Sequence, residues 1–181
     1  MAPRPTPTDL AAARGRQVPD VLAPGLRVLF CGINPGLWSA AVGHHFARPG
    51  NRFWKALHLA GFTDRLLTPD EETELLRHGL GITYLVDRAT TAAADLTPEE
   101  LRAGADRLAA KTRSARPDVV AVLGVGAYRT AFVRPRATVG PQPDPIGGAT
   151  ARVLPNPSGL NAHYQLADLA KAFAALRRSL D

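Results

Sequence analysis

A loop with an unusual combination of residues follows the first apolar run of the chain. The run at 26–31 reads "LRVLFC" and continues directly into "GINPG" at 32–36. Two glycines, a proline and one side-chain amide within five positions indicate a backbone that lies very close to another group. That group is either another part of the protein or a ligand.

Two common kinds of site match this region poorly. Residues 32–36 lack the G-x-G-x-x-G spacing of dinucleotide-binding loops and the G-K-[ST] ending of P-loops, which disfavours a small nucleotide-binding domain. The nearby pair His44 and His45 could bind a metal, but no cysteine or acidic cluster supports it. We therefore expect neither a metal nor an organic cofactor.

A second loop, "LPNPSGLNAHY" at 154–164, also joins an Asn-Pro pair to a nearby glycine. It places one large apolar residue, Leu160, between Gly159 and Asn161. Leu160 either folds back onto the core or remains in solvent as a wedge. An apolar side chain on a glycine-hinged polar loop can enter a stack of DNA bases and replace an extruded base. The second interpretation therefore predicts a contact with DNA.

The elements that must position these loops alternate along the chain. The apolar pattern predicts strands at 26–33, 82–86, 118–124 and 150–154, with a Pro/Gly loop at 134–149. The same pattern and the capping signals predict helices at 51–60, 68–79, 97–116, 125–132 and 164–180. This order predicts a single-domain α/β fold with a mainly parallel central sheet flanked by helices on both faces.

The functional crevice of such a sheet lies beyond the carboxyl ends of its strands. Three segments reach that edge: 32–46, 87–96 and 155–163. The two unusual loops belong to the first and third of these segments. We therefore expect the functional site there.

Length and composition limit the class of protein. The 181 residues suit one domain, and residues 1–25, rich in proline, alanine and arginine, predict a basic, loosely structured arm that can pack over the domain at 26–181. The net charge of +6 favours an anionic partner such as nucleic acid.

Cys31 is the only cysteine, which excludes intramolecular disulfides. The sequence shows neither a membrane-length apolar run nor a signal peptide, so we expect a cytoplasmic monomer without membrane contact.

Three motifs, in order, resemble the signatures of a known family. "GINPG", "HHFARPGNRFW" at 44–54 and "NPSGLN" at 156–161 resemble the mismatch-specific uracil-DNA glycosylases. These are bacterial relatives of thymine-DNA glycosylase within the uracil-DNA glycosylase superfamily. The resemblance extends from about Val18 to the C-terminal helix and includes "LVDRATTAAADLTPEEL" at 85–101. It implies the fold of that superfamily.

The resemblance also implies an activity in base excision repair. The enzyme would flip a uracil mispaired with guanine out of double-stranded DNA, hydrolyse its N-glycosidic bond and leave an abasic site. Thymine, cytosine adducts and single-stranded DNA remain open as substrates. A non-catalytic mismatch-binding or damage-binding protein is the alternative.

The resemblance assigns roles to individual residues. Asn34 falls on the catalytic asparagine, whose carbonyl oxygen can orient a water molecule although an amide cannot remove its proton at neutral pH. Backbone N–H groups of 32–36 would stabilise the leaving base, with Gly32 and Gly36 allowing its close approach. Phe46 would stack on the flipped base. The base pocket would comprise Gly32, Ile33, Pro35, Gly36, Phe46 and Asn156. The wedge and other DNA contacts would be Ser158, Gly159, Leu160, Asn161 and His163.

Two positions leave alternatives. The family often carries an arginine two residues after the wedge leucine, where this chain has Ala162 followed by His163. Either His163 takes over a contact or binding to the mismatch is weaker. Asp95, in the loop after the second strand, is either the general base that Asn34 cannot be or an exposed residue near a helix N-terminus. The adjacent pair Asp87 and Arg88 predicts a structural ion pair.

Overall fold

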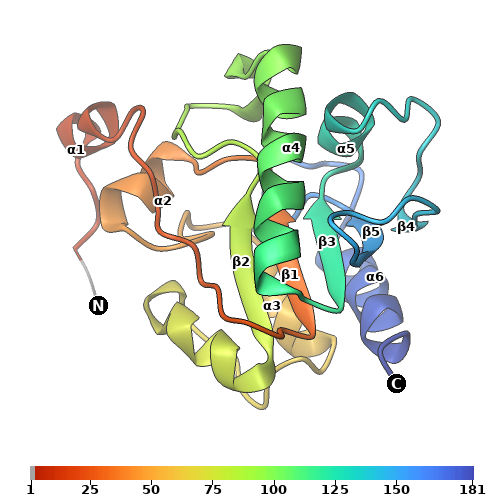
Figure 1. Ribbon diagram of the computed structural model, residues 1–181. Helices are drawn as coiled ribbons and strands as arrows, with labels where there is room; N and C mark the ends of the chain where they lie inside the picture. Colours follow the sequence, from red (N-terminus) through yellow and green to blue (C-terminus); the bar gives the residue numbers. More distant parts are fainter. Residues whose placement is uncertain (1–2) are drawn as a thin grey trace.

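A five-stranded sheet forms the centre of the computed structural model, which describes residues 3–181 (Figure 1). The strands are β1 (Val28–Gly32), β2 (Leu80–Tyr84), β3 (Val119–Leu123), β4 (Gly140–Pro141) and β5 (Thr150–Leu154). Their order is β2-β1-β3-β5-β4, and all neighbouring pairs are parallel except β4 with β5. The carboxyl ends of β1, β2, β3 and β5 therefore meet at one edge.

Helices cover both faces of this sheet (Figure 1). They are α1 (Pro7–Ala12), α2 (Leu37–Val42), α3 (Phe53–Leu59), α4 (Pro98–Ala115), α5 (Val125–Ala131) and α6 (Leu166–Arg178), with 3-10 helices η1 (Pro69–His78) and η2 (Ala93–Asp95). Helices α3 and α6 pack on one face, and α4 and α5 pack on the other. The predicted α/β fold with a mainly parallel, doubly covered sheet is confirmed.

Alternate residues of β1 build two separate cores. Phe30 faces α3 and α6, where its ring centroid lies 5.4 Å from that of Phe53 and 5.9 Å from that of Phe173. Leu29 and Cys31 point to the opposite face and pack with the residues of α4 and α5. Burial of both faces explains why the strands read as continuous apolar runs.

Some element boundaries differ from the prediction. Strand β2 covers 80–84 instead of 82–86, because Gly79 and Gly81 flank its first residue and weaken the strand pattern. A side chain at Gly81 would meet the backbone oxygen of Val21 at 2.4 Å, so this glycine admits a neighbouring segment. Helix α2 replaces part of the predicted loop after the first strand, and β4 lies inside the predicted loop 134–149.

The N-terminal arm is more ordered than predicted. Its first two residues lie outside the described part, and the rest includes α1, whose first turn is capped by Thr6. Val21 forms an antiparallel bridge with Ile82 of β2, and Ala13 is buried. The division of the chain at residue 25 stays a prediction. Among residues 3–181, no helix combines the length and the apolar character needed to cross a membrane.

Candidate active site

The loop after β1 is fixed to the segment after β2 by backbone hydrogen bonds. The carbonyl oxygens of Gly32 and Ile33 accept hydrogen bonds from the N–H groups of Leu85 and Val86, both at 3.0 Å. These bonds continue the β1–β2 pairing beyond the ends of the strands. Asn34, the next residue, is therefore held at the carboxyl edge of the sheet.

The side chain of Asn34 has one defined orientation. Its Nδ2 donates to the carbonyl oxygen of Arg88 at 3.0 Å and to Oγ1 of Thr90 at 2.8 Å. Thr90 donates its own hydroxyl proton to the carbonyl oxygen of Ala92 at 2.7 Å. Because both partners of the amide are acceptors, its nitrogen must face them and its carbonyl oxygen must face away. Among residues 3–181, no donor is bonded to this oxygen, so it is available to a ligand or a water molecule.

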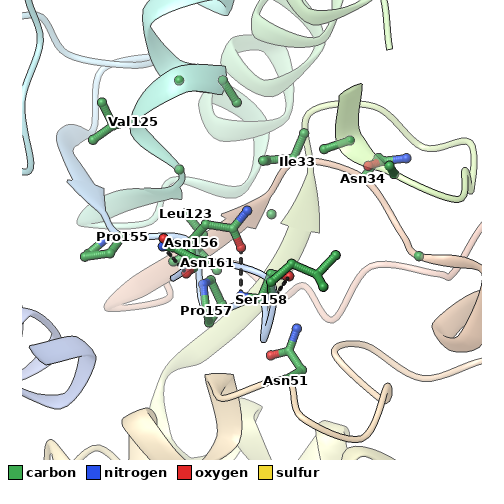
Figure 2. Close-up of a pocket in the computed structure, with 18 of the residues that line it drawn as sticks. Ile33, Asn34, Asn51, Leu123, Val125, Pro155, Asn156, Pro157, Ser158 and Asn161 are labelled. Carbon is green, nitrogen blue, oxygen red and sulfur yellow. Dashed lines mark hydrogen bonds between the residues drawn. The ribbon is translucent and has the colours of Figure 1, made fainter. Parts of the chain in front are cut away.

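Asn34 lines a cavity of about 760 Å³ at the carboxyl edge of the sheet. In Figure 2, Ile33 and Asn34 lie on one side, whereas Asn156 and Ser158 lie on another. Of the residues predicted for the site, the lining includes Gly32, Ile33, Asn34, Gly36, Phe46, Asn156, Ser158, Leu160, Asn161 and His163. The structure thus brings together both loops that the sequence singles out.

Phe46 forms part of the cavity wall. Its ring centroid lies 4.3 Å from that of Phe53 and 6.1 Å from that of Tyr84, so neighbouring aromatic rings hold it in place. The backbone of Phe46 is in the left-handed region, with φ of 52°, which is uncommon for a bulky residue. A base-stacking role stays a prediction, but the ring is held in place at the cavity.

The two glycines of 32–36 have different surroundings. A Cβ atom at Gly32 would lie 2.8 Å from Cε1 of Tyr84, so the lack of a side chain at Gly32 leaves room for the ring of Tyr84. The ring of Tyr84 therefore requires a glycine here, and Gly32 also lines the cavity, so its part in the close approach of a ligand stays a prediction. A Cβ atom at Gly36 would meet nothing within 4 Å, and Gly36 lines the cavity.

The loop at 156–161 is held by its own side chains (Figure 2). Oδ1 of Asn156 accepts from the N–H of Ser158 at 2.9 Å, and Oγ of Ser158 accepts from the N–H of Leu160 at 3.2 Å. Nδ2 of Asn161 donates to the carbonyl oxygen of Asn156 at 3.0 Å. The residue Leu160 is 74% exposed, which excludes the alternative in which it folds back onto the core. Its role as a wedge stays a prediction.

The charged residues of the cavity are all basic. Arg48 and Arg129 line it together with His163. Within the described part of the chain, no aspartate or glutamate belongs to the lining. Such a cavity favours an anionic ligand.

Asp95 lies outside the cavity lining. This residue is exposed, and its carboxylate accepts a hydrogen bond from the N–H of Ala92 at 3.1 Å. The geometry thus favours the local structural interpretation over a role as general base. Pro35 and Gly159 are also absent from the lining.

The predicted ion pair between Asp87 and Arg88 is wrong. Arg88 instead binds Glu100 in the first turn of α4, with Nε 2.6 Å from Oε1. The hydrogen bond from Arg88 is the main cause that lowers the pKa of Glu100 to about 2, and the N–H of Thr97 adds to it. The ion pair connects α4 to Arg88, and the carbonyl oxygen of Arg88 is one of the two acceptors that orient Asn34.

The two histidines at 44 and 45 have structural partners. Nε2 of the buried His45 donates to the carbonyl oxygen of Pro19 at 2.7 Å, and its Nδ1 accepts from the hydroxyl of Tyr84 at 3.0 Å. Burial is the main cause that lowers the pKa of His45. Nδ1 of His44 lies 3.1 Å from Oε1 of Glu72. Within residues 3–181, no group of three or more histidine, cysteine or acidic side chains could hold a metal ion.

Several parts of the site were not predicted from the sequence, among them Arg48 and Arg129 on the cavity wall. The turn at 123–126, between β3 and α5, lines the cavity, and the strand-end rule could have identified it because it follows a parallel strand. Thr90 also lines the cavity and orients Asn34. No local pattern marks this threonine, because its partner lies 56 residues away along the chain.

Comparison with known families identifies the class of protein that this fold and site define. The family model of the uracil DNA glycosylase superfamily matches residues 19–178, and the chain therefore belongs to this superfamily. This membership supports a DNA glycosylase role, hydrolysis of the bond between a base and its sugar, with DNA as the partner.

The structure is also similar to a solved one. A protein from Methanosarcina acetivorans, studied in solution by NMR and provisionally described as a uracil DNA glycosylase, matches with a TM-score of 0.58 and 19% sequence identity. The match covers 90% of this chain and 98% of that one. At this identity the likeness supports a shared fold.

Proposed function

We propose that the protein is a DNA repair glycosylase that extrudes uracil mispaired with guanine and hydrolyses its N-glycosidic bond. One observation carries this proposal: the oriented amide of Asn34 lines the same cavity as the exposed Leu160. An enzyme that acts on a base within a duplex needs a pocket for the extruded base. It also gains from a side chain that fills the space left behind.

The chemistry assigned to Asn34 is the orientation of a water molecule. Its free carbonyl oxygen accepts a hydrogen bond from water and directs the water oxygen towards the sugar carbon. Such a weak acceptor suffices if the bond between sugar and base breaks largely before water attacks. The sugar then resembles an oxocarbenium ion, and the base leaves as an anion. When the water oxygen bonds to the sugar carbon, the proton that it loses passes to bulk water or to the departed base.

The surroundings of Asn34 suit this order of events. No carboxylate of the described residues lines the cavity, so the lining offers no carboxylate as a general base. Backbone N–H groups of 32–36 are proposed to stabilise the anionic base, in the manner of an oxyanion hole. Arg48 and Arg129 on the cavity wall favour the phosphates of the DNA strand.

Phe46 is proposed to stack on the extruded base. Its ring lines the cavity and packs against that of Phe53, with 4.3 Å between the centroids. Stacking of one base on an aromatic side chain contributes ~1–3 kcal/mol, judged by alanine substitution. The stack does not distinguish uracil from thymine or cytosine adducts, which remain further candidate substrates.

The preference for a mismatch follows from the cost of extrusion. Removing a base from the helix costs a few kcal/mol, and least where the pair is mismatched. Uracil opposite guanine should therefore enter the cavity more readily than uracil opposite adenine.

A single-turnover panel tests the proposed function. Protein in excess is incubated with duplexes that carry one G·U, A·U or G·T pair, with single-stranded uracil DNA, and with a G·C duplex as control. We expect free uracil and abasic sites, formed faster from G·U than from A·U. Tight binding of the G·U duplex without any release of free base would instead identify a non-catalytic binder.

A further inference from the structure

We propose that Arg52 is a positioning residue that clamps the loop at 157–164 and so holds Leu160 ready for entry into the duplex. This inference rests on the proposed function and concerns how the same site acts. Leu160 itself is exposed, so contacts of its own side chain do not fix its place. Its position must come from the backbone on either side of it.

The guanidinium group of Arg52 is directed entirely to this backbone. Nη2 donates to the carbonyl oxygens of Ser158 at 2.6 Å and Asn161 at 3.2 Å. Nε donates to the carbonyl oxygen of Pro157 at 3.4 Å, and Nη1 donates to that of Tyr164. The backbone N–H of Arg52 also donates to Pro157, at 3.0 Å. These acceptors lie on both sides of Leu160 in the sequence.

Neither the helix dipole nor an ion pair explains why an arginine occupies position 52. It is the residue that precedes α3, where a positive charge opposes the helix dipole. Within residues 3–181, Arg52 forms no ion pair with an acidic side chain. The carbonyl oxygens of the loop therefore provide the polar partners of this half-buried guanidinium group.

A second contact seats the loop on the same turn. A Cβ atom at Gly159 would lie 2.8 Å from the carbonyl oxygen of Gly50, so the backbone of the loop lies directly against the turn that precedes α3. Arg52 and Gly159 therefore act at one junction. Ordering the loop in advance removes an entropic cost that the protein would otherwise meet when the duplex is opened.

An arginine suits this role because of its geometry. Its planar group presents several N–H donors in fixed directions, whereas a lysine presents one compact ammonium group. Arg52→Lys should therefore keep the charge but reach fewer carbonyl oxygens. Arg52→Gln should lose most of the clamp.

Cleavage rates test whether Arg52 acts through Leu160. We compare wild type, Arg52→Gln, Arg52→Lys, Leu160→Ala and the double variant Arg52→Gln/Leu160→Ala in single turnover. The substrates are an A·U duplex, a G·U duplex and a duplex with uracil opposite an abasic site, where no base pair must be broken. Arg77→Gln is the matched control, because Arg77 is exposed on η1 and the chemical change is the same.

We expect Arg52→Gln to slow release about tenfold from A·U, less from G·U, and less than about twofold from the unpaired uracil. Arg52→Lys should lie between wild type and Arg52→Gln. Because Arg52 acts through Leu160, the double variant should be no slower than Leu160→Ala alone. Equal slowing on all three substrates, or fully multiplicative effects in the double variant, would overturn the proposal.

Amide hydrogen exchange without DNA tests the clamp independently of activity. The N–H groups of Ser158, Leu160 and Asn161 are hydrogen-bonded within the loop. We expect Arg52→Gln to speed their exchange while β1 and β3 remain protected. Unchanged exchange in the loop would refute the clamp, even if wild-type protein cut no DNA. Absence of wild-type cutting would refute the proposed function and the wedge role, whereas the exchange result would still decide the structural role of Arg52.

Discussion

At the scale of single residues, the orientation of Asn34 depends on one hydroxyl group. Thr90→Val keeps the shape of the side chain but removes the acceptor that lies 2.8 Å from Nδ2 of Asn34. The amide should then rotate more freely and place water less well. We expect single-turnover release from G·U to slow about tenfold, equivalent to ~1.4 kcal/mol in the barrier.

Thr112→Val is the control for this substitution. It makes the same chemical change at a buried threonine of α4, which does not line the cavity. Release should be unchanged in this variant, and both proteins should remain folded by circular dichroism. Equal rates for Thr90→Val and wild type would show that Thr90 does not orient the catalytic amide.

Many of the residues that gather at the site could be predicted from the sequence. The hydrogen bonds that hold these residues in place could not. Asn34 and Leu160 stand out because their residue types are unusual at the ends of apolar strands. The fixation of Asn34 by Thr90, and of the second loop by Arg52, was not predicted. These hydrogen bonds connect residues far apart in the chain, so no local spacing could reveal them.

At the scale of elements, α4 contains a buried polar group without a partner. Oγ1 of Thr112 is fully buried, and no hydrogen-bond partner for it occurs among residues 3–181. Thr112→Val removes this group with little change of shape. We expect the free energy of unfolding to rise by about 1 kcal/mol, measured by urea denaturation.

The same substitution at Thr83 should change the free energy of unfolding in the opposite direction. Its buried hydroxyl donates to Oδ1 of Asp20 at 2.9 Å and accepts from Nζ of Lys111 at 2.8 Å. Thr83→Val leaves these partners incompletely satisfied, and the free energy of unfolding should fall by about 1–3 kcal/mol. Equal effects of the two substitutions would contradict this interpretation.

The elements themselves could largely be predicted from local patterns. Strand β5 was predicted with its observed bounds, and β3 to within one residue, because apolar runs mark both. Helix α2 was missed because it has only six residues, with glycines on both sides of it. Strand β2 was predicted two residues too late in the chain, because Gly81 weakens the strand pattern. This glycine accommodates the backbone of Val21, which is a tertiary contact that no local pattern marks.

At the scale of the whole molecule, His45 connects the N-terminal arm to the sheet and should make stability depend on pH. Burial lowers its pKa in the folded protein, and the nearby Glu72 only partly opposes this. In the unfolded chain the pKa is about 6.5. As pH falls through that value, the unfolded chain binds a proton that the folded protein does not. The free energy of unfolding should therefore fall by up to about 1.4 kcal/mol per pH unit until the folded pKa is reached.

Urea unfolding at pH 7.5 and 5.5 measures this effect. We expect wild type to lose more stability between these two values than His45→Asn, which has no group titrating in this range at that position. The same dependence in both proteins would assign the pH effect to other residues.

The particular contacts of the N-terminal arm could not be predicted from the sequence. Its composition predicted a basic and loosely structured segment, yet Val21 pairs with β2 and Pro19 accepts the His45 hydrogen bond. Both contacts join segments that are distant in sequence. Composition reports the average character of a segment and does not report such partners.

The most direct test of the central claim compares wild type with Asn34→Ala on a G·U duplex. Release of free uracil is followed in single turnover, and duplex binding is measured separately. Because the substitution removes the oxygen that orients water, we expect release to slow at least about a hundredfold, equivalent to ~2.7 kcal/mol. Binding should change only a few-fold, and EDTA should leave the wild-type rate unaffected. Undiminished release by Asn34→Ala would contradict the account.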